Sequence, residues 1–366
     1  MGIAGNSNYD DTTDIYTIRG SGQDIWDTAD AFHYVYRTVE GDAELIAHLG
    51  SEENTSEWAK IGLMIRQDKS EGSVYAMMTQ APLRGGHFQY RTTANAGCNQ
   101  TNTQNNGAPI WLRVVKDGNI VSGYDSPDGV NWTCRGAVRL PFNGPVMIGM
   151  AVCSNTGDSR CTATFDHVDL HSGLSFSPPS PWVDQEVGPT AIPGGTHWEN
   201  DECNLFASGK EIWNQADSFH YLSQPLSGDG YVMVRVESIL NTNSTAEAGI
   251  MFRENNASGS RHVSLLLTPG DGAYFLRRAT HDTNGDALSF SALSPLWLKL
   301  IRQGNTFSAS VSTNGMDWKL MGTDKVSMDD SISVGLVLSA KSTDRLGEVS
   351  FDHVKIGTGL PVDANP

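Results

Sequence analysis

The sequence predicts an all-β protein in which two similar antiparallel domains follow one another along the chain. Three observations support this expectation. The chain repeats itself at a nearly constant offset, and its apolar and polar residues alternate with a period of two. Glycine contributes 38 of 366 residues and only 18% of residues are charged, a composition that suits tight turns better than helices.

The internal repeat runs along nearly the whole chain. Residues of the first half recur 187 positions later, so that Trp26 returns as Trp213 and Arg66 as Arg253. After the loss of one residue the offset becomes 186 and stays there. Solenoid units are only about 20–50 residues long, so a repeat of this length is a duplicated domain. Each copy is long enough to bury a core of its own.

The repeat also sets the expected domain boundaries. We expect the first domain over residues 1–173, the second over 190–358, and a short tail over 359–366. Residues 174–189 separate the two copies and are rich in proline and serine. Proline restricts the backbone to extended conformations, so this segment is predicted to be a short, stiff linker.

Period-two alternation appears in both copies. Every second residue is apolar from Asp42 to Ser51, and apolar residues alternate with polar or small ones from Trp58 to Arg66. The matching segment of the second copy, residues 245–253, shows the same split. This pattern predicts antiparallel strands with one side facing a core. Glycine-containing turns at 126–132 and 312–318 predict hairpins.

Charge and terminal composition exclude several classes of partner. The formal net charge of −17 disfavours a nucleic-acid partner, because phosphate binding needs a basic face. An acidic surface tolerates calcium, although no motif requires a cofactor. No apolar run reaches the length of a membrane span, so membrane insertion is not expected. The first residues lack the charged start and apolar core of a signal peptide.

Four of the five cysteines lie in the first copy. Cys153 and Cys161 flank a polar stretch that reads as a hairpin-like loop. We expect a disulfide bond between them, since the composition is typical of extracellular proteins. The alternative is a pair of free, buried thiols.

Four stretches of the first copy resemble a known fold family. They are Gly22-x-Asp24-Ile25-Trp26, residues 29–36, residues 58–66 and residues 164–168. They resemble the concanavalin A-like lectin/glucanase superfamily, which includes laminin-G-like modules, and in particular tandem domains of secreted bacterial proteins. The resemblance implies two tandem antiparallel jelly-roll β-sandwich domains, each with one concave sheet. By association it also implies a secreted or cell-surface protein that binds polysaccharide or glycan.

The concave faces are the expected ligand sites. If the apolar side chains point into each sandwich, the alternate side chains share the concave surface. Aromatic rings stack on sugars, and planar donors bind hydroxyls or carboxylates, so an acidic polysaccharide is the expected ligand. The alternative is a solvated sheet face that only holds the fold. The expected ligand-binding residues are Trp58, Lys60, Arg66, Tyr75, His87, Gln89, Arg91, Arg253, His262, Tyr274 and Arg278.

One acidic motif is typical of glycoside hydrolases, but its expected position in a turn does not favour catalysis. Residues 40–44 read Glu-Gly-Asp-Ala-Glu and match the paired carboxylates of the superfamily's glycoside hydrolases. Gly41-Asp42 is expected in a turn, and the second copy lacks both glutamates. We therefore predict a non-catalytic, lectin-like tandem module. The alternatives are an adhesive cell-surface protein that self-associates through its sandwiches and, less favoured, a glycoside hydrolase.

Overall fold

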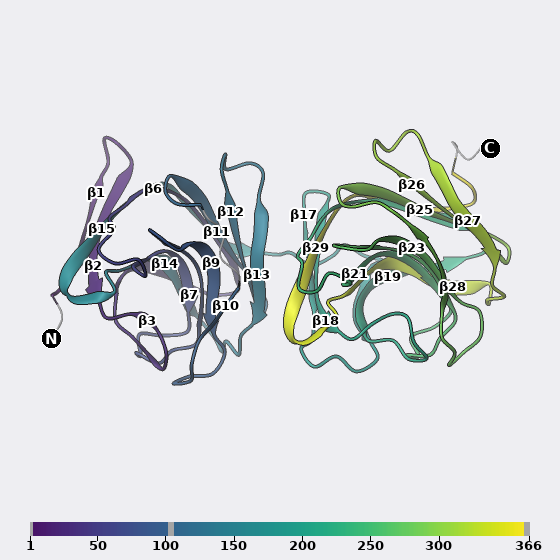
Figure 1. The fold of residues 1–366 in the computed structure, drawn as a ribbon, viewed down its shortest axis with the longest axis horizontal. Helices are drawn as coiled ribbons and strands as arrows, with labels where there is room; N and C mark the ends of the chain where they lie inside the picture. Colours follow the sequence, from purple (N-terminus) through teal and green to yellow (C-terminus); the bar gives the residue numbers. More distant parts are fainter. Residues whose placement is uncertain (1–2, 102–105, 362–366) are drawn as a thin grey trace. The chain divides into compact units, whose positions relative to one another are not determined.

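The computed structural model describes residues 3–101 and 106–361, in which every regular element is a β-strand. The chain divides into two compact units, residues 1–175 and residues 176–366. Each unit is an antiparallel jelly-roll β-sandwich of two layers, an outer sheet and an inner sheet that nests against it (Figure 1). The predicted fold class is therefore confirmed. No helix in the described residues could cross a membrane.

Unit 1 has an outer sheet of seven strands and an inner sheet of six. The outer sheet has the spatial order β1 (Asn6–Asp10), β2 (Ile15–Gly22), β15 (Thr156–Leu174), β6 (Asp42–Glu52), β11 (Ile110–Asp117), β12 (Ile120–Ser126) and β13 (Thr133–Arg139). The inner sheet has the order β10 (Asn99–Gln100), β9 (Gly85–Arg91), β8 (Tyr75–Ala81), β7 (Lys60–Arg66), β14 (Val146–Cys153) and β5 (His33–Val39). A two-stranded ribbon, β3 (Ile25–Trp26) and β4 (Ala29–Asp30), stands apart from both sheets.

Unit 2 repeats this topology with one additional strand. Its outer sheet has the order β17 (Gly195–Glu199), β18 (Glu202–Gly209), β29 (Ser342–Thr358), β20 (Gly230–Ile239), β25 (Leu296–Gln303), β26 (Thr306–Ser312) and β27 (Lys319–Lys325). Its inner sheet has the order β16 (Val183–Val187), β19 (Phe219–Ser227), β28 (Ser331–Ser339), β21 (Glu247–Arg253), β22 (His262–Thr268), β23 (Gly272–Arg278) and β24 (Asp286–Phe290). The two sheet orders match strand for strand except for β16.

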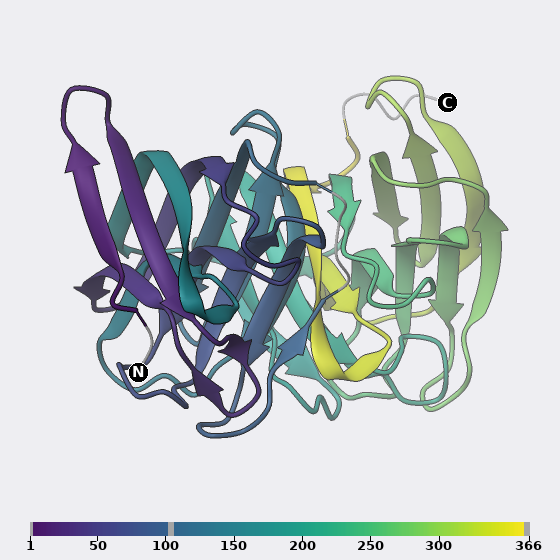
Figure 2. The same ribbon diagram turned by 60° about the vertical axis from the view of Figure 1, so that its left-hand side comes forward.

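The main core of each unit lies between its two sheets (Figure 2). In unit 1, Ile61, Leu63 and Ile65 of β7 pack in one fully buried cluster with Leu45 and Leu49 of β6. The alternation of apolar and polar residues in the sequence predicts that these side chains face the core. Burial of aliphatic side chains from both sheets is the main force that stabilises a sandwich, at about 1.5–3 kcal/mol per side chain.

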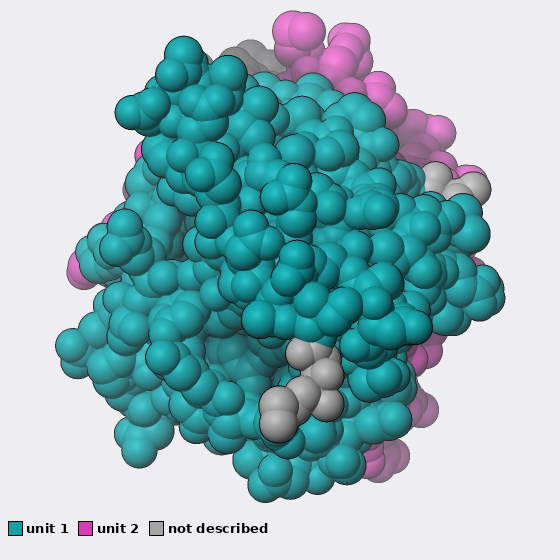
Figure 3. Space-filling view, turned by 90° about the vertical axis from the view of Figure 1, so that its left-hand side faces the viewer, with its two compact units in different colours: residues 1–175 teal, residues 176–366 magenta. Residues whose placement is uncertain are grey.

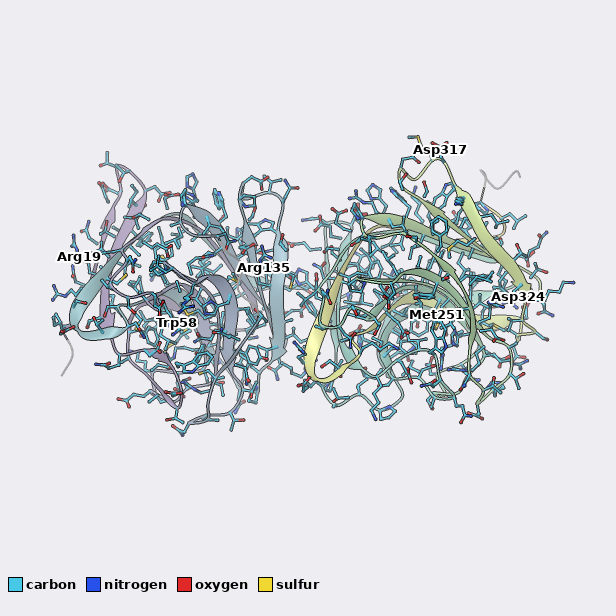
Figure 4. All side chains as sticks on the ribbon, viewed as in Figure 1. Arg19, Trp58, Arg135, Met251, Asp317 and Asp324 are labelled. Atoms are coloured by element: carbon cyan, nitrogen blue, oxygen red, sulfur yellow. The ribbon has the colours of Figure 1, made fainter. Side chains whose placement is uncertain are left out.

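The opposite face of each inner sheet is buried as well. In unit 1 it is covered by residues 22–32, here called the covering segment, and Ile25 packs there against Met64 and Met77. In unit 2 the covering segment is residues 209–219, and Ile212 packs against a cluster that includes Met251, labelled in Figure 4. The central inner strands are therefore buried on both sides, not half-buried as alternation predicted.

The segment expected to link the domains is partly folded into unit 2. β15 extends to Leu174, and Val183–Val187 forms β16 beside β19. Val187 is fully buried, because it packs against the apolar residues of the covering segment and of β19. Only residues 175–182 lie between the two strands. Of the expected tail, residues 362–366 lie outside the described residues.

The predicted disulfide is absent from the structure, since Cys153 and Cys161 are free thiols. The chain crosses from the inner sheet to the outer sheet between them, so the two side chains point into different clusters. The Cys153 thiol donates to the carbonyl oxygens of Gly22 and Ala31, and the Cys161 thiol to that of Glu53. Burial raises the pKa of both thiols to about 12, which keeps them protonated.

Candidate functional site

The expected concave binding faces are not accessible, because the covering segments occupy them. Nine of the eleven expected ligand-binding residues are no more than 3% exposed. This corrects the sequence prediction, and the physical reason is that the cationic side chains, Tyr75 and Gln89 bind the protein's own backbone and carboxylates, while the two histidines are buried beneath the covering segments. The nine residues are Lys60, Arg66, Tyr75, His87, Gln89, Arg91, Arg253, His262 and Arg278.

In unit 1, Arg91 and Asp30 form a fully buried ion pair. The two terminal nitrogens of Arg91 each donate to one carboxylate oxygen of Asp30 over 2.7 Å. One of them also donates to the carbonyl oxygens of Trp26 and Asp27, at 3.1 and 3.0 Å. A terminal nitrogen of Arg66 lies 3.5 Å from the same carboxylate. Both arginines thus attach the covering segment to the inner sheet, and the bidentate geometry of Arg91 serves the fold.

Unit 2 repeats the arrangement around Asp217. Arg278 donates to both carboxylate oxygens of Asp217, over 2.7 and 2.6 Å. Arg253 donates to one of these oxygens over 2.7 Å. Arg278 also donates to the carbonyl oxygen of Asn214 in the covering segment. Because all three side chains are fully buried, the duplicated arginines are structural.

Three more buried residues of the set bind the covering segment, whereas the ring nitrogens of His87 have no described hydrogen-bond partner. Gln89 donates to the carbonyl oxygen of Ile25 over 2.5 Å, and Tyr75 donates to it over 3.4 Å. Lys60 forms an ion pair with Asp24 of the covering segment. Burial lowers the pKa of His87 to about 4, so this histidine is neutral. Burial also lowers the pKa of His262.

Only Trp58 and Tyr274 of the expected set are half-exposed. The ring of Trp58, labelled in Figure 4, is covered by the Arg84 guanidinium at 4.7 Å from its centroid. The ring of Tyr274 instead meets Trp213 edge to face, with centroids 5.5 Å apart and planes at 85°. Of the two, Tyr274 lies in a pocket.

That pocket lies in unit 2 and has a volume of about 300 Å³. Trp213 comes from the covering segment, and Tyr274 comes from β23 of the inner sheet. Small-molecule pockets range over roughly 300–1,000 Å³, so this one has room for about one sugar ring. The polar lining comes from Glu211, Thr245, Glu247, Thr268, Asp271 and Lys341.

One lysine joins two of the carboxylates in the pocket. The Lys341 ammonium lies 3.0 Å from Glu247 Oε1 and 3.4 Å from Glu211 Oε2. Glu247 Oε2 accepts the backbone N–H of Ile212 over 2.7 Å. Burial raises the pKa of the Glu247 carboxyl, and the Lys341 ammonium opposes this shift. Both oxygens of Glu247 are therefore held in place, while Asp271 is exposed at the pocket mouth.

The sequence prediction missed Trp213, Glu211, Asp271 and Lys341. Trp213 recurs at the position of Trp26, and a tryptophan that recurs in both copies is expected to be a core residue. The pocket could have been predicted from positions at which the two copies of the repeat carry different residues. Glu247 and Tyr274 stand where the first copy has Lys60 and His87, so the pocket chemistry belongs to the second copy alone.

The acidic motif of residues 40–44 has no catalytic geometry. Gly41 has a φ of 77° and forms the predicted turn before β6. Glu44 accepts hydrogen bonds from Arg113 Nε at 2.5 Å and lies 3.2 Å from His171 Nδ1. Asp42 accepts the backbone N–H of Gly118 over 2.7 Å. Within the described residues, no group of three acidic, histidine or cysteine side chains could hold a metal ion.

No protein-family model matches this chain, and no curated protein sequence matches it. Among solved structures, a functionally unknown protein from Saccharomyces cerevisiae is 18% identical with a TM-score of 0.39, over 49% of this chain and 97% of that chain. Domains LG4-5 of the mouse laminin α1 chain are 8% identical with a TM-score of 0.24, over 96% and 89% of the two chains. A GH43B protein of the Bacteroides ovatus xyloglucan locus is 12% identical with a TM-score of 0.32, over 84% and 66%. At these values the similarities carry no argument about function.

Proposed function

We propose that this protein is a non-catalytic glycan-binding protein and that unit 2 takes a sugar residue in the pocket between Trp213 and Tyr274. The observation that supports the proposal is the edge-to-face aromatic pair in a pocket whose polar lining consists of three carboxylates, two hydroxyls and one ammonium. Aromatic rings pack against the C–H face of a pyranose, and carboxylates accept hydrogen bonds from its hydroxyls.

The charge of the pocket argues for a neutral sugar. Glu211, Glu247 and Asp271 place three carboxylates beside the single ammonium of Lys341. A uronate would be repelled by this surplus of negative charge, and like charges in close contact are costly to bury. The acidic polysaccharide expected from the arginines is therefore replaced by a neutral or amino-sugar glycan.

The fixed carboxylates argue against hydrolysis. A general acid must present a free proton to the glycosidic oxygen, and a nucleophile must present a free oxygen to the anomeric carbon. Glu247 has one oxygen on Lys341 and the other on the Ile212 N–H, and Glu211 shares the same ammonium. These residues are arranged to hold hydroxyls and not to transfer protons.

Isothermal titration of the full chain with neutral oligosaccharides selected on a glycan array tests the proposal. Tyr274→Ala and Asp271→Ala should each weaken binding by about fivefold or more, which corresponds to about 1 kcal/mol. Arg84→Ala is the matched control, because Arg84 is the exposed counterpart of Asp271 in unit 1 and should leave the affinity unchanged.

Two results would contradict this function. One is binding of a glycan with the same affinity by the wild type and by both pocket variants. The other is release of reducing ends from the bound oligosaccharide, abolished by Glu211→Gln, which would make the pocket an active site.

A further inference from the structure

The pocket of unit 2 offers a ligand more hydrogen-bond acceptors than donors. The Lys341 ammonium is shared by two carboxylates of the pocket. The hydroxyls of Thr245 and Thr268 donate to Asn243 Oδ1 and to the carbonyl oxygen of Gly272, each over 3.0 Å. These three donors of the lining are therefore engaged within the protein. Apart from its two aromatic side chains, the pocket presents a ligand mainly with carboxylate oxygens.

Asp271 is the carboxylate at the pocket mouth that the described ion pairs of the pocket leave without a cation. Lys341 contacts Glu211 and Glu247 but not Asp271. The turn that carries Asp271 is held in place, because its backbone N–H donates to the Thr268 hydroxyl over 2.9 Å. Asp271 thus presents an exposed negative charge on a fixed turn beside the aromatic pair.

The matching positions of unit 1, which is drawn in teal in Figure 3, carry the opposite charge. Arg84 stands at the position of Asp271, and Lys60 stands at that of Glu247. The Arg84 guanidinium lies over the ring of Trp58, 4.7 Å from its centroid. The acidic character of the pocket is therefore a property of the second copy and not of the shared fold.

The aromatic rings of the pocket favour a positive charge as well. The face of an indole or phenol ring carries partial negative charge, so it attracts an ammonium group placed over it. Trp213 and Tyr274 lie together in the pocket, and the uncompensated carboxylate of Asp271 belongs to the same lining. A sugar that packs on these rings is therefore bound more tightly if it carries a cationic substituent.

We propose that the sugar bound in this pocket is an amino sugar with a free, protonated amine, and that Asp271 selects it. This selection rests on the proposed glycan-binding function and names the class of its ligand. The pyranose ring packs on Trp213 and Tyr274, and its ammonium pairs with Asp271. An ammonium group has three donors and no acceptor, which matches a pocket that offers mainly acceptors.

Related sugars lack part of this match. A hydroxyl in place of the amine still donates to Asp271 but brings no charge. N-acetylation removes the charge and adds a carbonyl oxygen, for which the engaged Lys341 and threonine hydroxyls leave few donors. A polar group that is desolvated without a partner weakens binding. The pocket thus discriminates by what it fails to satisfy as well as by what it binds.

Isothermal titration of the full chain with three β-1,4-linked trisaccharides tests the proposal. They are built from glucosamine, N-acetylglucosamine or glucose, so they differ only in the substituent at C2. The glucosamine trimer should bind about tenfold more tightly than the glucose trimer at low salt, and the N-acetylglucosamine trimer no more tightly than the glucose trimer. The preference should shrink at high salt, because Asp271 is exposed.

Variants and a second cation separate Asp271 from the net charge of the protein. Asp271→Asn should reduce the preference to about twofold or less, and Asp271→Arg, which copies unit 1, should abolish it. Asp286→Asn removes the same charge from an exposed position on β24 and should leave the preference unchanged. Spermidine has as many amines as the glucosamine trimer but no pyranose ring, so it should not displace the trimer at equal concentration.

Three results would overturn the proposal. They are equal affinity for the glucosamine and glucose trimers, an equal loss of preference in Asp271→Asn and Asp286→Asn, and displacement of the trimer by spermidine. Glucose binding that Tyr274→Ala abolishes would then leave the glycan-binding function intact. If none of the trisaccharides binds, the amino-sugar specificity fails, whereas the function itself fails only if no oligosaccharide of the array binds.

Discussion

Asp30 and Asp217 each hold two arginines between an inner sheet and its covering segment. Arginine presents a planar fork with five donors. Here one carboxylate and several backbone carbonyls accept most of these hydrogen bonds, although Arg253 Nε has no described partner. At the residue scale, the same property that suits arginine for a sugar carboxylate suits it for a buried aspartate. Removal of the aspartate would leave two guanidinium groups buried without their counter-charge.

Asp217→Asn should therefore lower the free energy of unfolding of unit 2 by about 3–5 kcal/mol, the cost typical of breaking a buried ion pair. Denaturant-dependent hydrogen exchange, read on the amides of β21 and β23, measures this change for unit 2 alone. Asp286→Asn, at an exposed position on β24, is the control and should change it by less than about 0.5 kcal/mol. An equal effect of the two variants would refute the structural role of Asp217.

Glu348 should make stability fall with rising pH. Burial raises the pKa of this carboxyl to about 8, against 4.5 without burial. The native state keeps the proton between these values while the unfolded state loses it, so unfolding becomes easier as the pH rises through this window. Glu348→Gln should stabilise the protein by roughly 1–3 kcal/mol at about pH 8 and have little effect near pH 4.

Urea unfolding at several pH values measures the effect of Glu348→Gln. Glu237→Gln is the control, because Glu237 is exposed on β20 of the same sheet. A variant that is no more stable than the wild type at high pH would show that Glu348 is ionised in the native state.

At the scale of elements, alternation and repeat spacing predicted the strands that line the main core. Ala43, Leu45 and Leu49 face that core as expected, because strand side chains alternate strictly between two faces. Alternation cannot tell whether the polar face meets water or another segment of the same chain. The covering segments were missed for this reason, although Asp30 and Asp217 recur at the same offset as the arginines that bind them.

β16 was missed for a different reason. Three prolines lie just before this strand, and a proline-rich stretch predicts a linker. The residues that pair with β19 are Val183–Val187, whose apolar ends and polar middle are typical of a short strand. The candidate pocket was missed because its side chains come from the covering segment, from β21, β22 and β23, and from Lys341 just before β29, which only the tertiary fold brings together.

Val187→Ala tests whether β16 is part of the fold. Val187 is fully buried, so the loss of two methyl groups should destabilise unit 2 by about 1–2.5 kcal/mol. Val183→Ala is the matched control on the same strand, because that side chain is 50% exposed. Hydrogen exchange of the β19 amides should become faster in the first variant only. Identical behaviour of the two variants would mean that β16 is not docked.

At the scale of the whole chain, the two copies have the same sandwich fold but differ in the side chains on their surfaces. Both units keep the buried arginine–aspartate cluster, so neither concave face is free for a ligand. Unit 2 replaces Lys60 and His87 by Glu247 and Tyr274 and gains an aromatic, acidic pocket. The two copies therefore present different side chains at matching positions of the same scaffold.

Hydrogen exchange of the full chain with and without a bound neutral oligosaccharide tests most directly where a glycan binds. We predict slower exchange in the covering segment near Trp213 and in the turn and strand that lead to Tyr274, with unit 1 unchanged. Slower exchange confined to the strands that carry Arg66 and Arg91, or Arg253 and Arg278, would contradict it, because the ligand would then have displaced the covering segment from the concave face.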